Sequence, residues 1–205
     1  MQHPVPRQMQ TRKWNVGRMG FKNRLMASFC GVVLAISMSS PSVAQTVVHH
    51  AGGGVKVAAL EPGEVKAKVA QTSAVTSRAK GRIWCVPFAR EVTGINLQGN
   101  AKTWWDKAEN VYPKGQKPVV GSVLNFRSTK SMPMGHVAVV SKVISQRKIL
   151  IDHANWQRNK VSLNMAVIDV SARNDWSAVR VETLPNTLGS VYPTYGFIYR
   201  AAANG

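Results

Sequence analysis

The sequence predicts a single α+β domain in which helices precede an antiparallel β-sheet. Apolar residues recur at helical spacing between residues 85 and 94, whereas β-rich segments separated by loop residues dominate after Pro118. Helices followed by a run of strands are typical of this class. The chain has 205 residues and 44% hydrophobic content, which suffices for one modest core.

The first 44 residues are expected to be a secretory signal peptide. A basic stretch precedes an apolar run from Leu25 to Met38, and the small residues Ser42, Val43 and Ala44 follow. The apolar run is shorter than the roughly 20 residues that span a bilayer, and no positive stop-transfer cluster follows it. We therefore expect cleavage after Ala44, a location in the periplasm or cell wall, and no stable membrane insertion. An uncleaved membrane anchor is the alternative.

The charge of the chain predicts an anionic partner. Lys and Arg outnumber Asp and Glu by 27 to 9, a net charge of +18. Residues 1–44 hold six of the basic residues and none of the acidic ones, so the remainder carries 21 − 9 = +12. A cell-wall surface fits this charge, although a basic face can also be merely solvated. Nucleic acid is not expected as a partner, because the chain has a predicted leader and contains no recognisable nucleic-acid-binding module.

Residues 45–80 are expected to form a flexible, low-complexity tether, and residues 81–205 the catalytic domain. The first segment contains no aromatic residue and includes the run 52–54 of three glycines. Aromatic residues appear among periodic apolar positions from Ile83 onward. A monomer is expected.

Within the domain, a helix is predicted to begin at Cys85 and to stop at Gly94. A second short helix is predicted between Thr103 and Glu109. The predicted strands cover residues 119–126, 136–143, 148–153 and, as a closing strand, 196–200.

Cys85 is the candidate nucleophile. Once residues 1–44 are removed it is the only cysteine left, so it can form no internal disulfide in an oxidising compartment. At a helix N-terminus, the backbone dipole and unpaired N–H groups stabilise the thiolate, which is the attacking form. A buried structural cysteine is the alternative interpretation.

His136 is the candidate base, because it opens a buried strand directly after Gly135 and imidazole exchanges protons near neutral pH. A histidine that is merely hydrogen-bonded at a strand end is the alternative. The next strand ends in Asp152, His153 and Asn155, and strand alternation places His153 and Asn155 on one face. Asn155 or His153 could orient His136, with Asp152 as the competitor if the strand is bulged.

Four blocks of this sequence resemble the CHAP family of cysteine, histidine-dependent amidohydrolases and peptidases, over about residues 81 to 156. The blocks are Trp84-Cys85-Val86 with Phe88-Ala89, residues 118–126 (PVVGSVLNF), residues 135–140 (GHVAVV) and Asn155-Trp156. Any one block is common, but all four occur in the family's order and spacing. The resemblance implies a papain-like fold of the NlpC type, with N-terminal helices packed on an antiparallel β-sheet.

The resemblance also implies a function. Cys85 would attack an amide carbonyl of peptidoglycan, and His136 would act as base and then as acid. The bond would be either the N-acetylmuramoyl-L-alanine amide or a peptide bond in the stem or cross-bridge. The oxyanion hole would use the backbone N–H of Cys85 and a donor from the preceding loop. No cofactor or metal is implied.

One position departs from the family. Many relatives have Glu, any residue and then Asn, whereas His153 stands in the Glu place and Asn155 in the Asn place. A neutral His153 accepts a hydrogen bond but supplies no negative charge to the imidazolium. A non-catalytic, murein-binding or scaffold protein that keeps the fold is therefore the second hypothesis.

Overall fold

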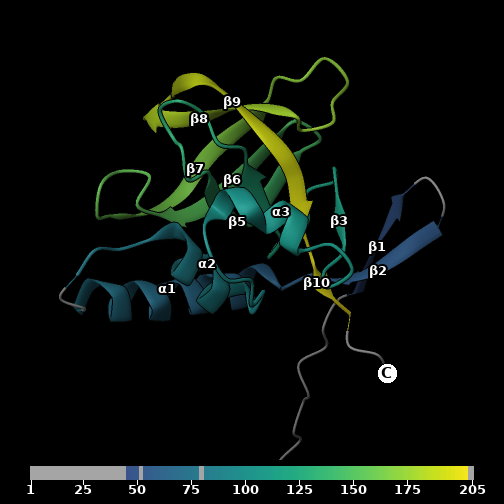
Figure 1. The fold of residues 1–205 in the computed structure, drawn as a ribbon, viewed down its shortest axis with the longest axis horizontal. Helices are drawn as coiled ribbons and strands as arrows, with labels where there is room; N and C mark the ends of the chain where they lie inside the picture. The colour runs from purple at the N-terminus through teal and green to yellow at the C-terminus, as the bar shows by residue number, and fades with distance from the viewer. Residues whose placement is uncertain (1–44, 51–52, 79–80, 203–205) are drawn as a thin grey trace, which may run out of the picture. The chain divides into compact units, whose positions relative to one another are not determined.

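A computed structural model describes residues 45–50, 53–78 and 81–202 (Figure 1). The predicted signal peptide lies outside these residues. The helices are α1 (Pro62–Arg78), α2 (Cys85–Thr93), the 3-10 helix η1 (Ala101–Thr103) and α3 (Trp104–Lys107). The strands are β1 (Gln45–His50), β2 (Gly53–Ala58), β3 (Lys114–Gly115), β4 (Val123–Phe126), β5 (His136–Ser145), β6 (Lys148–Ala154), β7 (Val161–Asp169), β8 (Ala178–Leu184), β9 (Thr187–Ile198) and β10 (Arg200–Ala201).

The main sheet has seven strands in the order β3-β9-β4-β5-β6-β7-β8, and every pairing is antiparallel. The long strand β9 pairs with β4 along one part and with β8 along another, so the sheet curls into a partial barrel (Figure 1). β1, β2 and β10 form a separate three-stranded sheet. The prediction of a mixed α+β domain with an antiparallel sheet is confirmed, while its papain-like topology stays a prediction.

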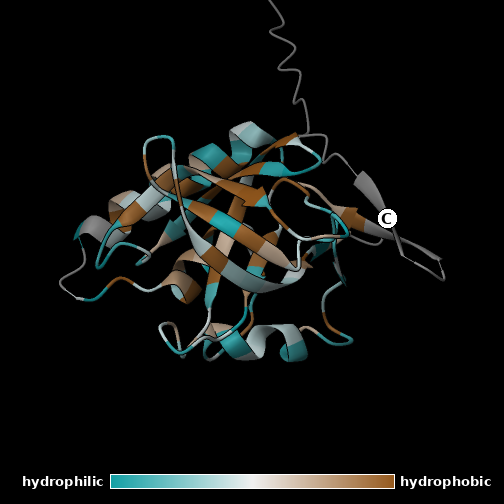
Figure 2. Cartoon of the chain, turned by 90° about the horizontal axis from the view of Figure 1, so that it is seen from above, coloured by the Kyte–Doolittle hydropathy of each residue, from teal (hydrophilic) through white to brown (hydrophobic). Residues whose placement is uncertain are grey.

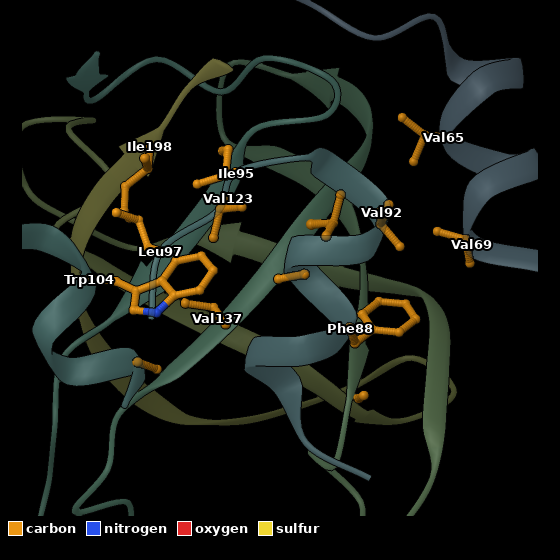
Figure 3. Close-up of a cluster of buried hydrophobic side chains, with 14 of the residues drawn as sticks. Val65, Val69, Phe88, Val92, Ile95, Leu97, Trp104, Val123, Val137 and Ile198 are labelled. Atoms are coloured by element: carbon orange, nitrogen blue, oxygen red, sulfur yellow. The ribbon is translucent and has the colours of Figure 1, made fainter. Parts of the chain in front are cut away.

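Strand β5 lies between two hydrophobic clusters because its side chains alternate. Val137 and Val139 belong to the cluster that also contains buried side chains of α1 and α2, whereas Ala138 and Val140 belong to the cluster enclosed by the curled sheet. In the first cluster, Figure 3 shows side chains of α1, α2 and β5 gathered around one core. The start of α2 is therefore held close to the start of β5.

Helix α2 ends as predicted. Gly94 is its C-cap, with φ +74°, and its N–H donates to the carbonyl of Arg90 at 2.8 Å. The left-handed conformation favours glycine at this position. Thr93 donates its hydroxyl to the carbonyl of Ala89 within the last turn. The second predicted helix is shorter than expected, since α3 spans only Trp104–Lys107.

The segment expected to be a tether is structured where it is described. Residues 62–78 form α1, and Val65 and Val69, which are four residues apart, are buried on one face of that helix. Leu60 is also buried and donates its N–H to the carbonyl of Val120 at 3.1 Å. The low aromatic content was misleading here, because small apolar residues at helical spacing are enough to cover α2.

Strands β7, β8 and the first part of β9 were not predicted. They supply the buried residues Val167, Val179 and Val181 to the cluster inside the curled sheet. Figure 2 shows hydrophobic residues concentrated along the strands of this sheet. The predicted closing strand at 196–200 corresponds to the end of β9. Within the described ranges, no helix combines the length and the apolar character required to cross a membrane.

Candidate active site

Cys85 is the first residue of α2, as the sequence predicted. The N-cap residue is Trp84, whose side chain makes no capping hydrogen bond, and the third helical residue is Pro87, which has no N–H. The first turn therefore presents the backbone N–H groups of Cys85 and Val86, which face the Cys85 sulfur. Two donors at a helix N-terminus stabilise a negative charge placed beside them.

The sulfur of Cys85 lies beside the start of β5. Burial raises the pKa of the Cys85 thiol, and the backbone N–H groups of Val137, Val86 and Cys85 itself act in the opposite direction by stabilising the thiolate. Burial is the larger effect, so the free protein holds a thiol. The side chain is half-buried and free of any disulfide. Since Val137 follows His136 directly, the candidate nucleophile and base are neighbours in space.

Gly135 determines how β5 begins at His136. It has φ +66°, and a Cβ atom there would lie 2.8 Å from the backbone nitrogen of Lys102 and 3.0 Å from the carbonyl oxygen of Phe126. Both the backbone conformation and the space require glycine. The close approach also allows the N–H of Lys102 to donate to the carbonyl of Met134 at 2.9 Å. Gly135 therefore leaves room for the backbone at Lys102 of η1.

His136 is 5% exposed and is surrounded by aromatic rings. The rings of Phe126 and Trp156 meet it edge to face, at centroid distances of 5.7 and 5.1 Å. Burial lowers the pKa of His136 to about 3, because the charged imidazolium would lose its hydration. The imidazole is therefore neutral in the free protein at neutral pH.

His153 is the residue that contacts His136. Its Nδ1 lies 3.1 Å from Nε2 of His136, and its side chain is fully buried. The ring of Trp156 stacks on it at a centroid distance of 5.4 Å and an interplanar angle of 24°. Nε2 of His153 lies 3.0 Å from the sulfur of Met165 on β7. Burial and, secondarily, the adjacent His136 hold the pKa of His153 well below its usual value.

Asn155 lies outside strand β6 and does not share a strand face with His153. Its φ of +61° turns the chain away after Ala154, and its Oδ1 accepts the N–H of Asn159 at 2.8 Å. Oδ1 of Asn159 in turn accepts the N–H of Ile83, also at 2.8 Å. Asn155 is thus connected to the loop before Cys85, and the expectation of strand alternation fails because the left-handed residue ends the strand.

Asp152 contacts the next strand. Its Oδ1 accepts the N–H of Asn164 at 2.6 Å, and burial is the main cause of its raised pKa. A bulge does occur here, but on β7: Ile151 pairs with Met165 and His153 pairs with Ser162. One additional residue on β7 is therefore accommodated opposite Asp152. Among the hydrogen bonds of the described residues, none joins Asp152 to either histidine.

The loop before Cys85 is partly exposed and lines two cavities. Trp84 is 49% exposed, and the guanidinium of Arg82 lies over its ring at 4.3 Å from the centroid. A cavity of about 370 Å³ is lined by Arg82, Trp84, Pro87 and part of α1, and another of about 470 Å³ lies between Ile83, Asn159 and α1. The loop residue Ile83 and the α1 residue Thr76 line both cavities.

This geometry can support acyl transfer. Nε2 of His136 is occupied by His153, so Nδ1 is the ring nitrogen left for the thiol of Cys85. The N–H groups of the first turn are available to an oxyanion. Sequence reasoning missed Met165 and Asn159, because neither residue type signals a position next to the site without knowledge of strand register.

Comparison with known proteins gives one match, to a family model that covers part of the chain. Residues 77–155 match the family model described as the CHAP domain, which confirms the resemblance seen in the sequence. A CHAP domain indicates an amidase or peptidase activity related to peptidoglycan. Neither the curated proteins nor the solved structures include a match to the chain.

Proposed function

We propose that the CHAP domain of this chain is a secreted cysteine hydrolase that cleaves an amide bond of peptidoglycan, with Cys85 as nucleophile and His136 as base. One observation carries the proposal most directly. The Cys85 thiol stands at a helix N-terminus and faces the backbone N–H groups of Cys85, Val86 and Val137, while His153 occupies Nε2 of His136.

The reaction begins with proton transfer from the Cys85 thiol to Nδ1 of His136 as the sulfur attacks the amide carbonyl carbon. The carbonyl oxygen becomes an oxyanion, which the N–H groups of Cys85 and Val86 stabilise. The His136 imidazolium then donates its proton to the amide nitrogen, the C–N bond breaks, and the amine leaves. A thioester to Cys85 remains.

Water completes the cycle. His136, again neutral, takes a proton from the water that attacks the thioester carbonyl, and the C–S bond breaks. The products are a carboxylic acid and the regenerated Cys85 thiol. No oxidant, metal or cofactor enters this balance.

The resting pair is neutral in this proposal. Burial raises the pKa of Cys85 and lowers that of His136, so both effects oppose a thiolate–imidazolium pair. His153 adds no negative charge that would counter them. Proton transfer therefore accompanies attack on the substrate, and substrate binding that closes the site from water would strengthen the helix N-terminal field.

The proposed substrate follows from the family and the charge. The net charge of residues 45–205 is +12 by the arithmetic above, which favours an anionic wall polymer. The predicted leader would deliver the chain to the periplasm or cell wall. The bond is either the N-acetylmuramoyl-L-alanine amide or a peptide bond of the stem or cross-bridge.

Product analysis tests the proposal. The full chain and its Cys85→Ala variant are incubated under reducing conditions with purified peptidoglycan of several wall types, and mass spectrometry identifies the new ends. Free stem peptides with intact glycan, formed only when Cys85 is present, indicate an amidase. New peptide termini indicate an endopeptidase. Folded, reduced protein that yields no Cys85-dependent product would overturn the enzyme proposal.

A second candidate, a peptidoglycan-binding scaffold without activity, is favoured by two observations. His153 replaces the acidic residue of many relatives, and the thiol of Cys85 is protonated at rest. Sedimentation of the chain with insoluble peptidoglycan separates the two. Equal binding by the wild type and Cys85→Ala, with no products from either, supports the scaffold.

A further inference from the structure

His136, His153 and Met165 form a continuous chain of side-chain contacts that begins in β5 and ends in β7. Nε2 of His136 lies 3.1 Å from Nδ1 of His153, and Nε2 of His153 lies 3.0 Å from Sδ of Met165. Met165 is partly buried and packs against the cluster inside the curled sheet. Its position opposite Ile151 places it directly after the bulge of β7.

The thioether of Met165 determines which ring nitrogen carries the hydrogen in His153 and in His136. A thioether has no hydrogen to donate and is only a weak acceptor, whereas neutral imidazole has one donor and one acceptor nitrogen. Beside Met165, His153 therefore carries its hydrogen on Nε2, and its Nδ1 presents a lone pair. That lone pair accepts a hydrogen from Nε2 of His136. Nδ1 of His136 is then left without a hydrogen.

The direction of the hydrogen bond between His136 and His153 matters, because an imidazole can either donate or accept, whereas a carboxylate can only accept. A carboxylate beside His136 could only accept, so it would fix the tautomer alone. A histidine at the same place can either donate or accept, and donation would put the hydrogen of His136 on Nδ1, toward the thiol. Such a tautomer could not act as a base. A second acceptor is therefore needed behind His153.

We propose that Met165 is a positioning residue whose sulfur accepts the Nε2–H of His153 and thereby fixes the tautomer in which Nδ1 of His136 can take the proton of Cys85. This role deepens the proposed function and rests on it. The bulge of β7 aims Met165 at His153, and Asp152 holds that bulge through its 2.6 Å hydrogen bond to the N–H of Asn164.

The tautomers are measured without substrate, so the result does not depend on the chain being an enzyme. Long-range ¹H–¹⁵N correlation spectra of full chain labelled at histidine distinguish Nδ1–H from Nε2–H. The expected spectrum has both His136 and His153 as the Nε2–H form. A His153 that carries its hydrogen on Nδ1 in the wild type would overturn the proposal.

Two variants test the sulfur. Met165→Leu keeps an apolar side chain of similar size but removes the acceptor, so His153 is expected to populate both tautomers and kcat to fall about 10-fold with little change in KM. Met165→Gln supplies an amide that can either accept or donate, so it should restore a hydrogen bond to Nε2 of His153 without fixing the tautomer, and kcat should recover only in part.

Met132→Leu is the matched control, because Met132 is also partly buried against the same cluster but its side chain makes no hydrogen bond within the part of the chain that the structure describes. It should leave tautomers and kcat unchanged. Wild-type tautomers in Met165→Leu, or equal losses in the Met165→Leu and Met132→Leu variants, would show that the sulfur only packs. A loss of activity in all forms with intact tautomers would instead refute the enzyme proposal alone.

Discussion

The histidine side of the site and its cysteine side differ in how they are held. His136 and His153 lie on adjacent strands, 5% and 0% exposed, and each ring is enclosed by aromatic neighbours. Cys85 is half-buried at the start of a helix, next to the exposed Trp84, and the loop before it lines two cavities. The sheet therefore encloses the base, while the nucleophile lies at a helix start and is less buried.

The two sides of the site also differ in how they stabilise a charge. On both sides burial opposes ionisation, but only the cysteine side has helix N–H groups that stabilise a charge once it forms. The histidine side offers a neutral imidazole and a thioether. The site is thus arranged to move a proton during attack and not to store a separated pair of charges beforehand.

The largest expected effect comes from removing the base. His136→Gln keeps a neutral side chain of similar size and should lower kcat/KM by about 10²- to 10⁴-fold, the usual contribution of a general base. The measurement is the hydrolysis rate of a defined peptidoglycan fragment, with circular dichroism to confirm folding. A folded variant that keeps wild-type activity would show that His136 is not the base, and would contradict the assignment of roles to the two sides.

Acid should destabilise the fold through the histidine side. His136 has a folded pKa of about 3, and that of His153 is also below its unfolded value near 6.5. Below pH 6.5 the unfolded chain binds more protons, so the stabilisation present above that pH is lost as the pH falls toward 3. Each histidine contributes a slope of up to about 1.4 kcal/mol per pH unit.

Urea denaturation between pH 7 and pH 4 measures this slope, and the double variant His136→Gln with His153→Gln is the control. The free energy of unfolding of the double variant should depend less steeply on pH than that of the wild type. Equal slopes would mean that the histidines are not buried in the neutral form.

Changes at His153 should be intermediate in size. His153→Gln retains a hydrogen-bonding group but permits either direction, so kcat should fall roughly 10-fold. His153→Glu should raise the pKa of His136 by stabilising its imidazolium, and the acid limb of kcat/KM should move to higher pH. If both variants give the pH profile of the wild type, His153 does not orient the base.

The smallest effect is expected on the cysteine side at Asn159, which accepts the N–H of Ile83. Asn159→Gly permits the positive φ of 59° but removes that hydrogen bond, which typically contributes about 0.5–1.5 kcal/mol. We expect kcat/KM to fall about two- to three-fold. Asn186→Gly, at a similar φ of 62° in the β8–β9 turn, is the matched control and should leave the rate unchanged.

The sequence blocks around Cys85 and His136 carried most of what could be predicted. Helical periodicity and Gly94 located α2, and the apolar run after His136 located β5. These signals are local, so they survive without knowledge of the fold. Helix α1 was missed because its apolar residues are small, and its face is recognisable only once α2 is placed against it.

The contacts that complete the site could not be predicted, because they depend on register between distant strands. The bulge of β7 decides that Met165 and not its neighbours reaches His153. The left-handed Asn155 decides that its amide serves the turn leading to Asn159. A shift of one residue in strand register would change the contact of Met165, and a different φ would change the contact of Asn155. Neither the register nor the φ value can be read from the hydrophobic pattern.

The most direct test of the account is to look for the acyl-enzyme. Reactions of the full chain with a soluble peptidoglycan fragment are quenched in acid, and mass spectrometry then measures the intact chain and the peptide that contains Cys85. The account predicts an added mass equal to the acyl part of the substrate, attached to Cys85, removable by hydroxylamine and absent from Cys85→Ala. Hydrolysis that proceeds equally in Cys85→Ala, with no adduct on the wild type, would contradict it.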